Sequence, residues 1–466
     1  MSIQDYGFAV TQSIKMPTPL DSQIFGPLFS DPEIAQLFTD EAYVRALVAV
    51  EAALARAEAR VGVIPQEAAE QISNAADANK IDIGALTKGT LRSGFPIIAL
   101  VEEIRRSVGA EAAPYVHWGA TTQDIMDTAC MLQVHAAGSL LDDRLGELAR
   151  QLGELADRHR AVVLAARTHG QQALPISLGL KIANWLAPML RHRERLAEIS
   201  ARVLVVQFGG AAGTLAALED KGLVVMEALA EELHLGAPAM PWHTQRDNLV
   251  EFAGWLSLVT GSLGKMAQDI ILLAQTEVGE LAESGEEGRG GSSTMPQKSN
   301  PITSELILAA ARMNASLLSA MHHALIQEQE RGTHGWQVEW LTLPQMILLA
   351  GGALKHGLYL AKNLQVDEAK MRENITRAND VILAESAVFA LAQAMPRAEA
   401  EALVKKASGV AVAEGKPLID TVRNLTSGMV PEGAVDWQAL AAPENYLGET
   451  QRIIDRVLKS SNKLSS

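Results

Sequence analysis

RDNLVEFAGWLSLVTGSLGKMAQDIILLAQTEVGELA, residues 246–282, is the stretch that most narrows the choice of fold. Apolar and small residues recur along it at helical spacing, and no proline interrupts it. A helix of this length exceeds the roughly 8–20 residues that are usual in globular proteins. The stretch therefore predicts one long helix of a helix bundle.

Three other segments repeat this pattern. Long helices are expected at residues 124–166, 175–206 and 301–330. Their alanine-rich faces suit close packing of helix against helix. A lone subunit would struggle to cover so many apolar faces, so we expect some of these helices to pack against other subunits.

The two ends of the chain are built differently. Residues 1–30 read as an irregular arm, and a helix is expected to begin near residue 31, where Asp31 can cap it. After about Asn363, prolines and glycines break the chain into shorter helical segments. We find no convincing strand. The sequence thus predicts an all-α fold of three helical domains, namely an N-terminal domain (1–118), a central long-helix bundle (119–363) and a C-terminal domain (364–466).

Composition and charge exclude several classes of protein. The chain has 55 acidic and 40 basic residues, a net charge of −15, which argues against nucleic acid and anionic membranes as partners. Its single cysteine, Cys130, can form no intrachain disulfide. The N-terminus lacks the features of a secretory signal, and no uncharged run is apolar enough to span a bilayer. We expect a cytoplasmic protein.

A glycine-rich loop carries the strongest sign of chemistry. Residues 285–291, GEEGRGG, hold four glycines in seven positions, so the preceding helix cannot continue through them without cost. Two serines follow, then Lys298 and Asn300. The next helix can open at Pro301, and a helix N-terminus favours anions. A plain flexible linker is the alternative, but the lysine, asparagine and prolines do not fit it.

The stretch GSSTMPQKSNP, residues 291–301, resembles the signature of the fumarase/aspartase superfamily. The resemblance implies that Ser292 abstracts a proton α to a carboxylate. It also implies that four neighbours contact the substrate: Ser293, Met295, Lys298 and Asn300. A serine hydroxyl is a weak base, so it needs surroundings that favour the alkoxide. Fixed donors aimed at the doubly charged aci-carboxylate that forms would supply the largest catalytic contribution.

Two further motifs agree with this resemblance. Residues 117–124, HWGATTQD, are similar to a family stretch that binds substrate carboxylate. The residues that the resemblance implies are His117, Thr121, Thr122 and Gln123. A simple helix cap at Thr122 is the alternative reading.

Residues 167–171, RTHGQ, resemble the region that supplies a proton donor in the C–N lyases of the superfamily. The resemblance implies that His169 protonates the leaving group. Histidine suits this role because its pKa lies near working pH. A purely structural histidine is the alternative.

Three other stretches narrow the branch of the superfamily. Residues 205–214, 241–247 and 327–344 look like the 3-carboxy-cis,cis-muconate cycloisomerase branch. The resemblance adds Gln245, Arg246 and Arg331 as candidate carboxylate ligands. Arg331 is the strongest, because a guanidinium grips carboxylate in a bidentate fork. For Arg246, an ordinary pair with its neighbour at a helix N-terminus is the alternative.

Departures from the family patterns separate possible substrates. Adenylosuccinate lyases carry an Arg-Tyr pair where residues 24–27 here read IFGP, and a histidine where residues 92–96 read RSGFP. Both losses argue against a nucleotide substrate. The cycloisomerases commonly lack a histidine at the position of His169, and a lactone needs no acid for an amine. This histidine therefore favours C–N elimination.

We accordingly expect reversible β-elimination from an N-substituted aspartate, giving fumarate and an amine. The alternatives are the cycloisomerase reaction and, more remotely, a non-catalytic role like that of the eye-lens crystallins. The resemblance implies a homotetramer with a core of 20 helices, active sites shared between three subunits, and a small di- or tricarboxylate substrate. We expect no cofactor and no metal, because His322 and His323 are helix neighbours that point apart.

Overall fold

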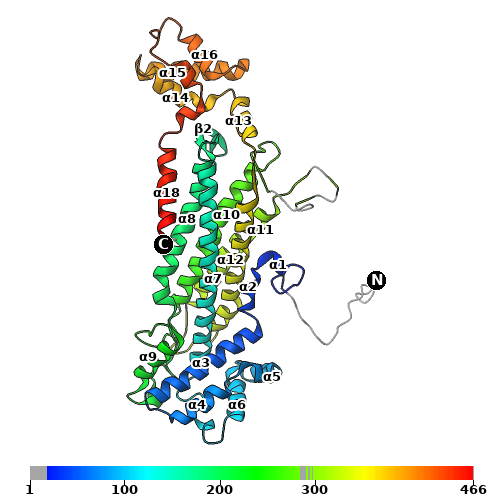
Figure 1. Ribbon diagram of the computed structural model, residues 1–466, viewed down its shortest axis with the longest axis vertical. Coiled ribbons are helices and arrows are strands. Elements are labelled where there is room, and N and C mark those ends of the chain that lie inside the picture. Colours follow the sequence, from blue (N-terminus) through cyan, green and yellow to red (C-terminus); the bar gives the residue numbers. More distant parts are fainter. Residues whose placement is uncertain (1–17, 284–289, 292–293, 296–297, 465–466) are drawn as a thin grey trace. The chain divides into compact units, whose positions relative to one another are not determined.

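Helices dominate the computed structural model, which describes residues 18–464 apart from 284–289, 292–293 and 296–297 (Figure 1). Helices make up 67% of the structure, and strands are few. The expectation of an all-α fold is therefore confirmed. Ser292, Ser293 and Gln297 of the signature loop lie outside the described residues.

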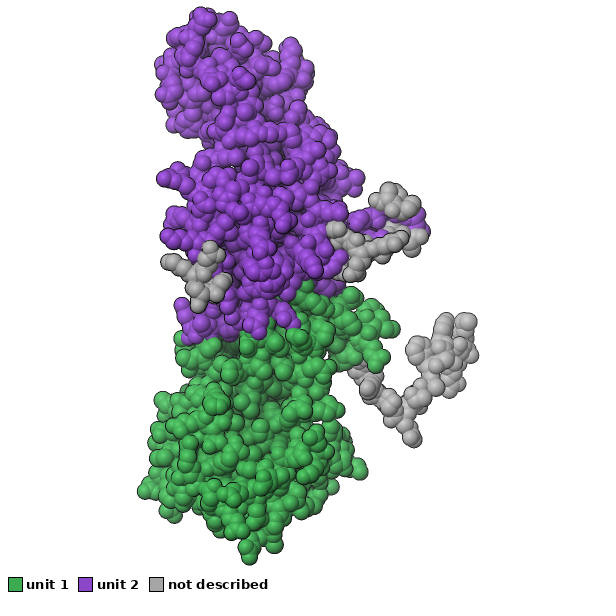
Figure 2. Space-filling model, viewed as in Figure 1, with its two compact units in different colours: residues 1–140, 199–257, 313–355 green, residues 141–198, 258–312, 356–466 purple. Residues whose placement is uncertain are grey.

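The chain divides into two compact units, each assembled from three separate segments (Figure 2). Unit 1 contains residues 1–140, 199–257 and 313–355, and unit 2 contains residues 141–198, 258–312 and 356–466. Five long helices thus contribute residues to both units: α7 (Thr122–Arg158), α8 (Leu178–Val203), α10 (Asp247–Leu273), α11 (Ile302–Ala324) and α12 (Gly335–Asn363). The division into three consecutive domains at residues 118 and 363 stays a prediction.

Unit 1 is built around α3 (Asp40–Arg60). Its other helices are α1 (Gly26–Phe29), α2 (Pro32–Gln36), α4 (Gln66–Ala75), α5 (Ile83–Ser93), α6 (Ile97–Ser107) and α9 (Gly222–Leu233), with short 3-10 turns at Ala78–Lys80, Ala113–Tyr115 and Ala216–Leu218. The core lies where α3 packs on α4 and α9, and it includes the fully buried Leu47 and Val50. As expected, Asp31 caps α2 by accepting from the N–H groups of Glu33 and Ile34.

Unit 2 contains most of α8 and the start of α11, followed by a group of shorter helices. These are α13 (Glu368–Arg377), α14 (Ala384–Leu391), α15 (Arg397–Glu414), α16 (Leu418–Leu425), α17 (Trp437–Leu440) and α18 (Thr450–Leu464), with 3-10 turns at Val381–Leu383 and Pro443–Tyr446. Arg193 of α8 pairs with Asp142 of α7, and Trp185 of α8 donates to Asp269 of α10 at 2.7 Å. These polar contacts align the long helices within the unit.

Two small antiparallel sheets, each of two strands, correct the expectation that the chain has no strands. β1 (Val163–Thr168) pairs with β2 (Gln171–Ser177), and β3 (Leu281–Glu283) pairs with β4 (Leu364–Val366). Two long helices consequently end earlier than predicted, α7 at Arg158 and α10 at Leu273. The run AVVLAA after α7 is rich in β-branched and apolar residues, which fit a strand as well as a helix.

The helix α10 is long and apolar enough to cross a membrane, judged by length and composition alone, and half of its most apolar window is buried inside the protein. The core helices of bundles have the same character. We therefore assign α10 to the protein core.

Candidate functional site

The candidate residues of unit 1 gather around the start of α7, where Asp124 is the central anchor. Its carboxylate is 1% exposed and accepts four hydrogen bonds. Oδ1 accepts from the N–H of Gly209 at 3.0 Å and from Nε2 of His243 at 2.7 Å. Oδ2 accepts from the N–H groups of Gly210 at 2.9 Å and Thr121 at 3.0 Å. The carboxylate thus ties the start of α7 to two distant loops.

The Gly209–Gly210 turn needs its glycines for two different reasons. A Cβ atom at Gly209 would lie 2.6 Å from Cβ of Pro241 and 2.8 Å from Cε1 of His243. Gly210 has φ of +67°, in the left-handed region that favours glycine. The turn can therefore approach the anchoring carboxylate closely and present its carbonyl groups outward.

The predicted ligand His117 lies five residues before the start of α7, with φ of +63°. Its Nδ1 atom is 2.7 Å from Oε1 of Glu51, which is buried on α3. Burial alone would lower the pKa of His117, but the Glu51 carboxylate outweighs it and raises that pKa above its usual value. The imidazole is therefore held in its cationic form to higher pH, which suits a site for anions.

The hydroxyl groups of Thr121 and Thr122 remain available to a ligand. Thr122 is the first residue of α7, and both threonines are half-buried. Within the described ranges neither hydroxyl has a hydrogen-bond partner, and the carboxylate of Asp124 binds the backbone N–H of Thr121 instead. The alternative that Thr122 serves only as a helix cap is therefore not supported.

The predicted ligand Gln123 is buried, and both ends of its amide are engaged. Its Nε2 donates to Oδ2 of Asp127 at 3.1 Å and to the carbonyl of His243 at 3.0 Å. Its Oε1 accepts from Nη1 of Arg331 at 3.0 Å. Direct contact with substrate is thus a wrong expectation for Gln123, because no donor or acceptor of its amide faces open space.

Arg331 is held by neutral acceptors. Besides the amide of Gln123, its Nη2 donates to the carbonyl groups of Gly210 at 3.3 Å and Ala211 at 2.9 Å. A guanidinium has five N–H donors, so the Nε donor and one Nη1 donor stay unused by the part of the chain that the structure describes. Because no carboxylate of the described residues touches it, Arg331 keeps its charge for an anionic ligand.

Arg246, unlike Arg331, is paired with carboxylates, and this corrects the expectation that it binds substrate. Its side chain is fully buried and donates to both oxygens of Asp127, at 2.6 and 3.0 Å, and to Glu339 at 2.8 Å. The guanidinium also lies over the ring of Trp242. Two carboxylates neutralise it and solvent cannot reach it, so Arg246 is wrong as a substrate ligand. Gln245, by contrast, is exposed, and its amide contacts the sulfur of Met240.

Three residues of this network were missed by the sequence analysis: Asp127, Trp336 and Glu339. Trp336 donates from Nε1 to Oδ1 of Asp127 at 2.9 Å. Burial raises the pKa of Glu339 to about 6, although the guanidinium of Arg246 opposes the rise. The only available sequence signal was the spacing of Asp124 and Asp127, which puts them on one face of a helix.

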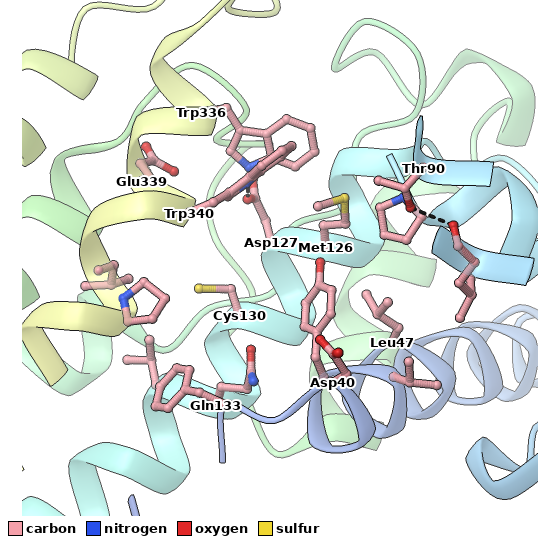
Figure 3. A pocket seen from close by; sticks show the side chains of 18 of the residues that line it. Asp40, Leu47, Thr90, Met126, Asp127, Cys130, Gln133, Trp336, Glu339 and Trp340 are labelled. Atoms are coloured by element: carbon pink, nitrogen blue, oxygen red, sulfur yellow. Dashed lines mark hydrogen bonds between the residues drawn. The ribbon is translucent and has the colours of Figure 1, made fainter. Parts of the chain in front are cut away.

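A cavity of about 510 Å³ lies beside this network within unit 1. Figure 3 shows Asp127 and Cys130 reaching it from α7, and Trp336, Glu339 and Trp340 from α12. The other lining residues are mostly apolar, and burial raises the pKa of the Cys130 thiol to about 12. The cavity therefore gives the charged network an apolar wall and holds its cysteine as a neutral thiol.

The predicted acid His169 lies in unit 2, at the tip of the β1–β2 hairpin. It is exposed, with φ of +52°, and Gly170 follows at +78°. Two residues with positive φ are typical of a tight type I′ hairpin turn. Arg167 anchors the hairpin through a bidentate pair with the fully buried Glu280, at 2.6 and 2.9 Å. The fold thus presents His169 on a rigid support.

The signature loop is closed at its base. Gly291 and Ser299 form an isolated antiparallel bridge, and the N–H of Asn300 donates to the carbonyl of Gly290 at 2.8 Å. Lys298 is exposed, and Met295 is 43% exposed. The lysine can therefore reach a ligand outside the loop.

The N-terminus of α11, which follows this loop, is already occupied. Oε1 of Glu283 accepts from the N–H of Ser304 at 2.8 Å, and Oε2 accepts from the N–H of Thr303 at 3.0 Å. The expectation that these donors await an anionic substrate is therefore wrong. A carboxylate of the chain itself takes the place that a bound anion would occupy.

The described residues contain no group of three or more His, Cys, Asp or Glu side chains that could hold a metal ion. His322 and His323 are both exposed near the end of α11.

Comparison with known proteins gives the family context. The profile of a family described as "Lyase" matches residues 29–313. The 3-carboxy-cis,cis-muconate cycloisomerase of Acinetobacter baylyi is 41% identical over 94% of this chain and 99% of that protein. The cycloisomerase of Bradyrhizobium diazoefficiens is 44% identical over 94% and 98%. The crystal structure of 3-carboxy-cis,cis-muconate lactonizing enzyme from Pseudomonas putida is 40% identical, with a TM-score of 0.88 over 96% and 100% of the two chains.

Two lyases that are named for other reactions match as well. Nitrosuccinate lyase of Streptomyces davaonensis is 35% identical over 96% of both chains. The N-acetyl-S-(2-succino)cysteine lyase of Dickeya dadantii is 32% identical over 94% of this chain and 97% of that protein.

Proposed function

Because this chain belongs to the lyase family of the fumarase/aspartase superfamily, we propose that it is a 3-carboxy-cis,cis-muconate cycloisomerase. Such an enzyme closes a lactone ring by adding one carboxylate of its substrate to a carbon–carbon double bond. Relatives with this name match at 41% and 44% identity over nearly their full length. Lyases of other substrates match at 35% and 32%.

This proposal reverses the order of the two reactions that the sequence analysis considered. His169 favoured cleavage of a C–N bond, and the more distant relatives keep that reaction as the second candidate. The exposed tip of a rigid hairpin suits either role for His169. In lactone formation no amine leaves, so the imidazole would orient the attacking carboxylate.

The proposed reaction needs one bond to form and one proton to move. A carboxylate oxygen attacks the β-carbon of the double bond, and the π electrons move to the carbon beside a second carboxylate. Ser292 then delivers a proton to that carbon, and in the reverse direction its alkoxide removes it. The intermediate is an aci-carboxylate with two negative charges, so positive groups aimed at it lower the barrier most.

The single observation that carries the proposal is the state of Arg331. Its guanidinium is fixed by three neutral oxygens and keeps two unused donors. A carboxylate can therefore bind to it with charge-assisted hydrogen bonds. We propose that Thr121, Thr122 and His117 line the same carboxylate site, with Lys298 and Ser292 supplied by a neighbouring subunit of a homotetramer in the cytoplasm.

The test compares both candidate reactions with one purified protein. We expect 3-carboxy-cis,cis-muconate to be consumed, as followed by its ultraviolet absorbance, while fumarate mixed with varied amines is left unchanged. Consumption of fumarate and amine alone would support C–N lyase activity and overturn the proposal. Ser292→Ala should slow the muconate reaction by roughly 100-fold or more, because general acid–base groups contribute about that much.

A further inference from the structure

We propose that Asp127 is a positioning residue, which holds the guanidinium of Arg331 in its binding geometry through the side-chain amide of Gln123. The inference rests on the proposed function, in which Arg331 binds a substrate carboxylate. Asp127 lies on α7, is 2% exposed, and accepts four hydrogen bonds from protein side chains, so its oxygens are not free to bind substrate. Its effect must therefore pass through the side chains that it binds.

The orientation of Gln123 is forced by its neighbours. Its Nε2 faces two acceptors, the carboxylate of Asp127 and the carbonyl of His243. If the amide were turned the other way, its oxygen would face the Asp127 carboxylate and the His243 carbonyl. No hydrogen atom would then be available for a hydrogen bond to either acceptor. The oxygen of Gln123 therefore has to face Arg331, where it accepts at 3.0 Å. The position of this one acceptor helps to fix the guanidinium.

Asp127 is itself fixed by three donor side chains: Gln123 on its own helix α7, Arg246 just before α10 and Trp336 on α12. Oδ2 accepts from Gln123 and from Nη1 of Arg246, and Oδ1 accepts from Nη2 of Arg246 and from Nε1 of Trp336. Its charge is met by Arg246, which in turn pairs with Glu339. The carboxylate is thus held rigidly and needs no counter-charge from the direction of Arg331.

The neutral amide between Asp127 and Arg331 has a consequence for charge. A carboxylate in direct contact with Arg331 would neutralise it and compete with the substrate. The amide of Gln123 binds Asp127 through its nitrogen and Arg331 through its oxygen. It therefore fixes the guanidinium relative to Asp127 and keeps the negative and positive charges apart. The network therefore orients Arg331 without weakening its attraction for an anion.

Asp127→Asn disturbs this arrangement without changing the size of the side chain. The amide of Asn has one oxygen, so its NH₂ group must face donors that the carboxylate accepted before. Gln123 then loses its partner or turns, and Arg331 loses a fixed contact. We expect the KM for 3-carboxy-cis,cis-muconate to rise about 10-fold or more, as for a lost hydrogen bond to a charged group. The turnover number kcat should change less than about 3-fold, because the uniform binding of a carboxylate remote from the reacting carbon affects KM first.

A double-mutant cycle tests whether the effect passes through Arg331. In an Arg331→Ala background, Asp127→Asn should raise KM no further. Trp336→Phe removes only one of the donors to Asp127 and should raise KM about 3-fold, again only when Arg331 is present. Cys130→Ala, one turn further along α7, lines the same cavity and is the control with unchanged KM.

The outcomes separate the two proposals. If Arg331→Ala leaves KM unchanged, Arg331 is no substrate ligand and the proposed function is the part that fails. If Arg331→Ala raises KM while the effects of Asp127→Asn simply add to it, the positioning role is wrong and Asp127 is only structural. Should Asp127→Asn fail to fold, the cycle with Trp336→Phe decides by the same criterion.

Discussion

Glu58 on α3 offers a prediction about stability that can be worked out from its surroundings. The side chain is 0% exposed, and within the described ranges neither carboxylate oxygen has a hydrogen-bond partner. Burial raises the pKa of Glu58 from 4.5 to about 9, and the charge of Glu51 adds to the rise. The folded protein therefore holds this group protonated at neutral pH, whereas the unfolded chain ionises it.

The sign of the effect follows from proton uptake on folding. The raised pKa of Glu58 stabilises the folded protein fully only below the pKa that this group has in the unfolded chain. The stabilisation falls as pH rises above that value, and it is lost completely once pH passes the pKa of the folded state. One proton changes the free energy of unfolding by about 1.4 kcal/mol per pH unit. Between pH 4.5 and 7.5 the wild-type protein therefore loses about 4 kcal/mol through Glu58. Glu58→Met fills similar space without a titrating group and should not suffer this loss.

The assay is urea denaturation of both proteins at a series of pH values, followed by circular dichroism. The difference in unfolding free energy between Glu58→Met and wild type should grow by about 1.4 kcal/mol per pH unit from pH 5 to pH 8. Glu67→Met, at an exposed position of α4, is the control and should show no such slope. A difference for Glu58→Met that is independent of pH would show that the folded protein does not hold Glu58 protonated.

Three further predictions follow from particular contacts. Arg246→Leu leaves two buried carboxylates without a counter-charge and should lower the unfolding free energy by about 3–5 kcal/mol in thermal melts; a loss below about 1 kcal/mol would contradict the buried network. Gly209→Ala places a Cβ 2.6 Å from Pro241 and should cost about 1–3 kcal/mol, whereas Gly409→Ala, with open space inside α15, should stabilise by up to about 1 kcal/mol. His169→Gln should slow lactone formation by less than about 10-fold; a loss of about 100-fold or more would indicate a proton-transfer role, as in C–N cleavage.

The helices could be predicted because their signals are local. Asp31 caps α2 through N–H groups two and three residues away, and the spacing of apolar residues marked the long helices. The β1–β2 hairpin was missed because its first strand continues the apolar pattern of α7. His169 and Gly170 form the turn at its tip, both with positive φ. We interpreted these two residues only as part of the RTHGQ motif and not as a turn.

The candidate site was harder to predict because its contacts are long-range. Arg246 resembled a ligand by motif, but its true partners, Asp127 and Glu339, are 119 and 93 residues away. Gln123 and Arg331 meet across 208 residues. A motif shows that such residues belong to one region, but only the fold shows which guanidinium is neutralised and which keeps its charge.

Lactone formation in deuterium oxide tests whether the protein adds a carboxylate to the double bond and then delivers a proton. The purified protein is incubated with 3-carboxy-cis,cis-muconate in this solvent, and the product is examined by NMR and mass spectrometry. Attack of a carboxylate followed by proton delivery predicts a lactone with one deuterium on the carbon beside a carboxylate. Failure to consume the muconate, or a lactone that carries no solvent deuterium, would contradict the proposed cycloisomerase reaction.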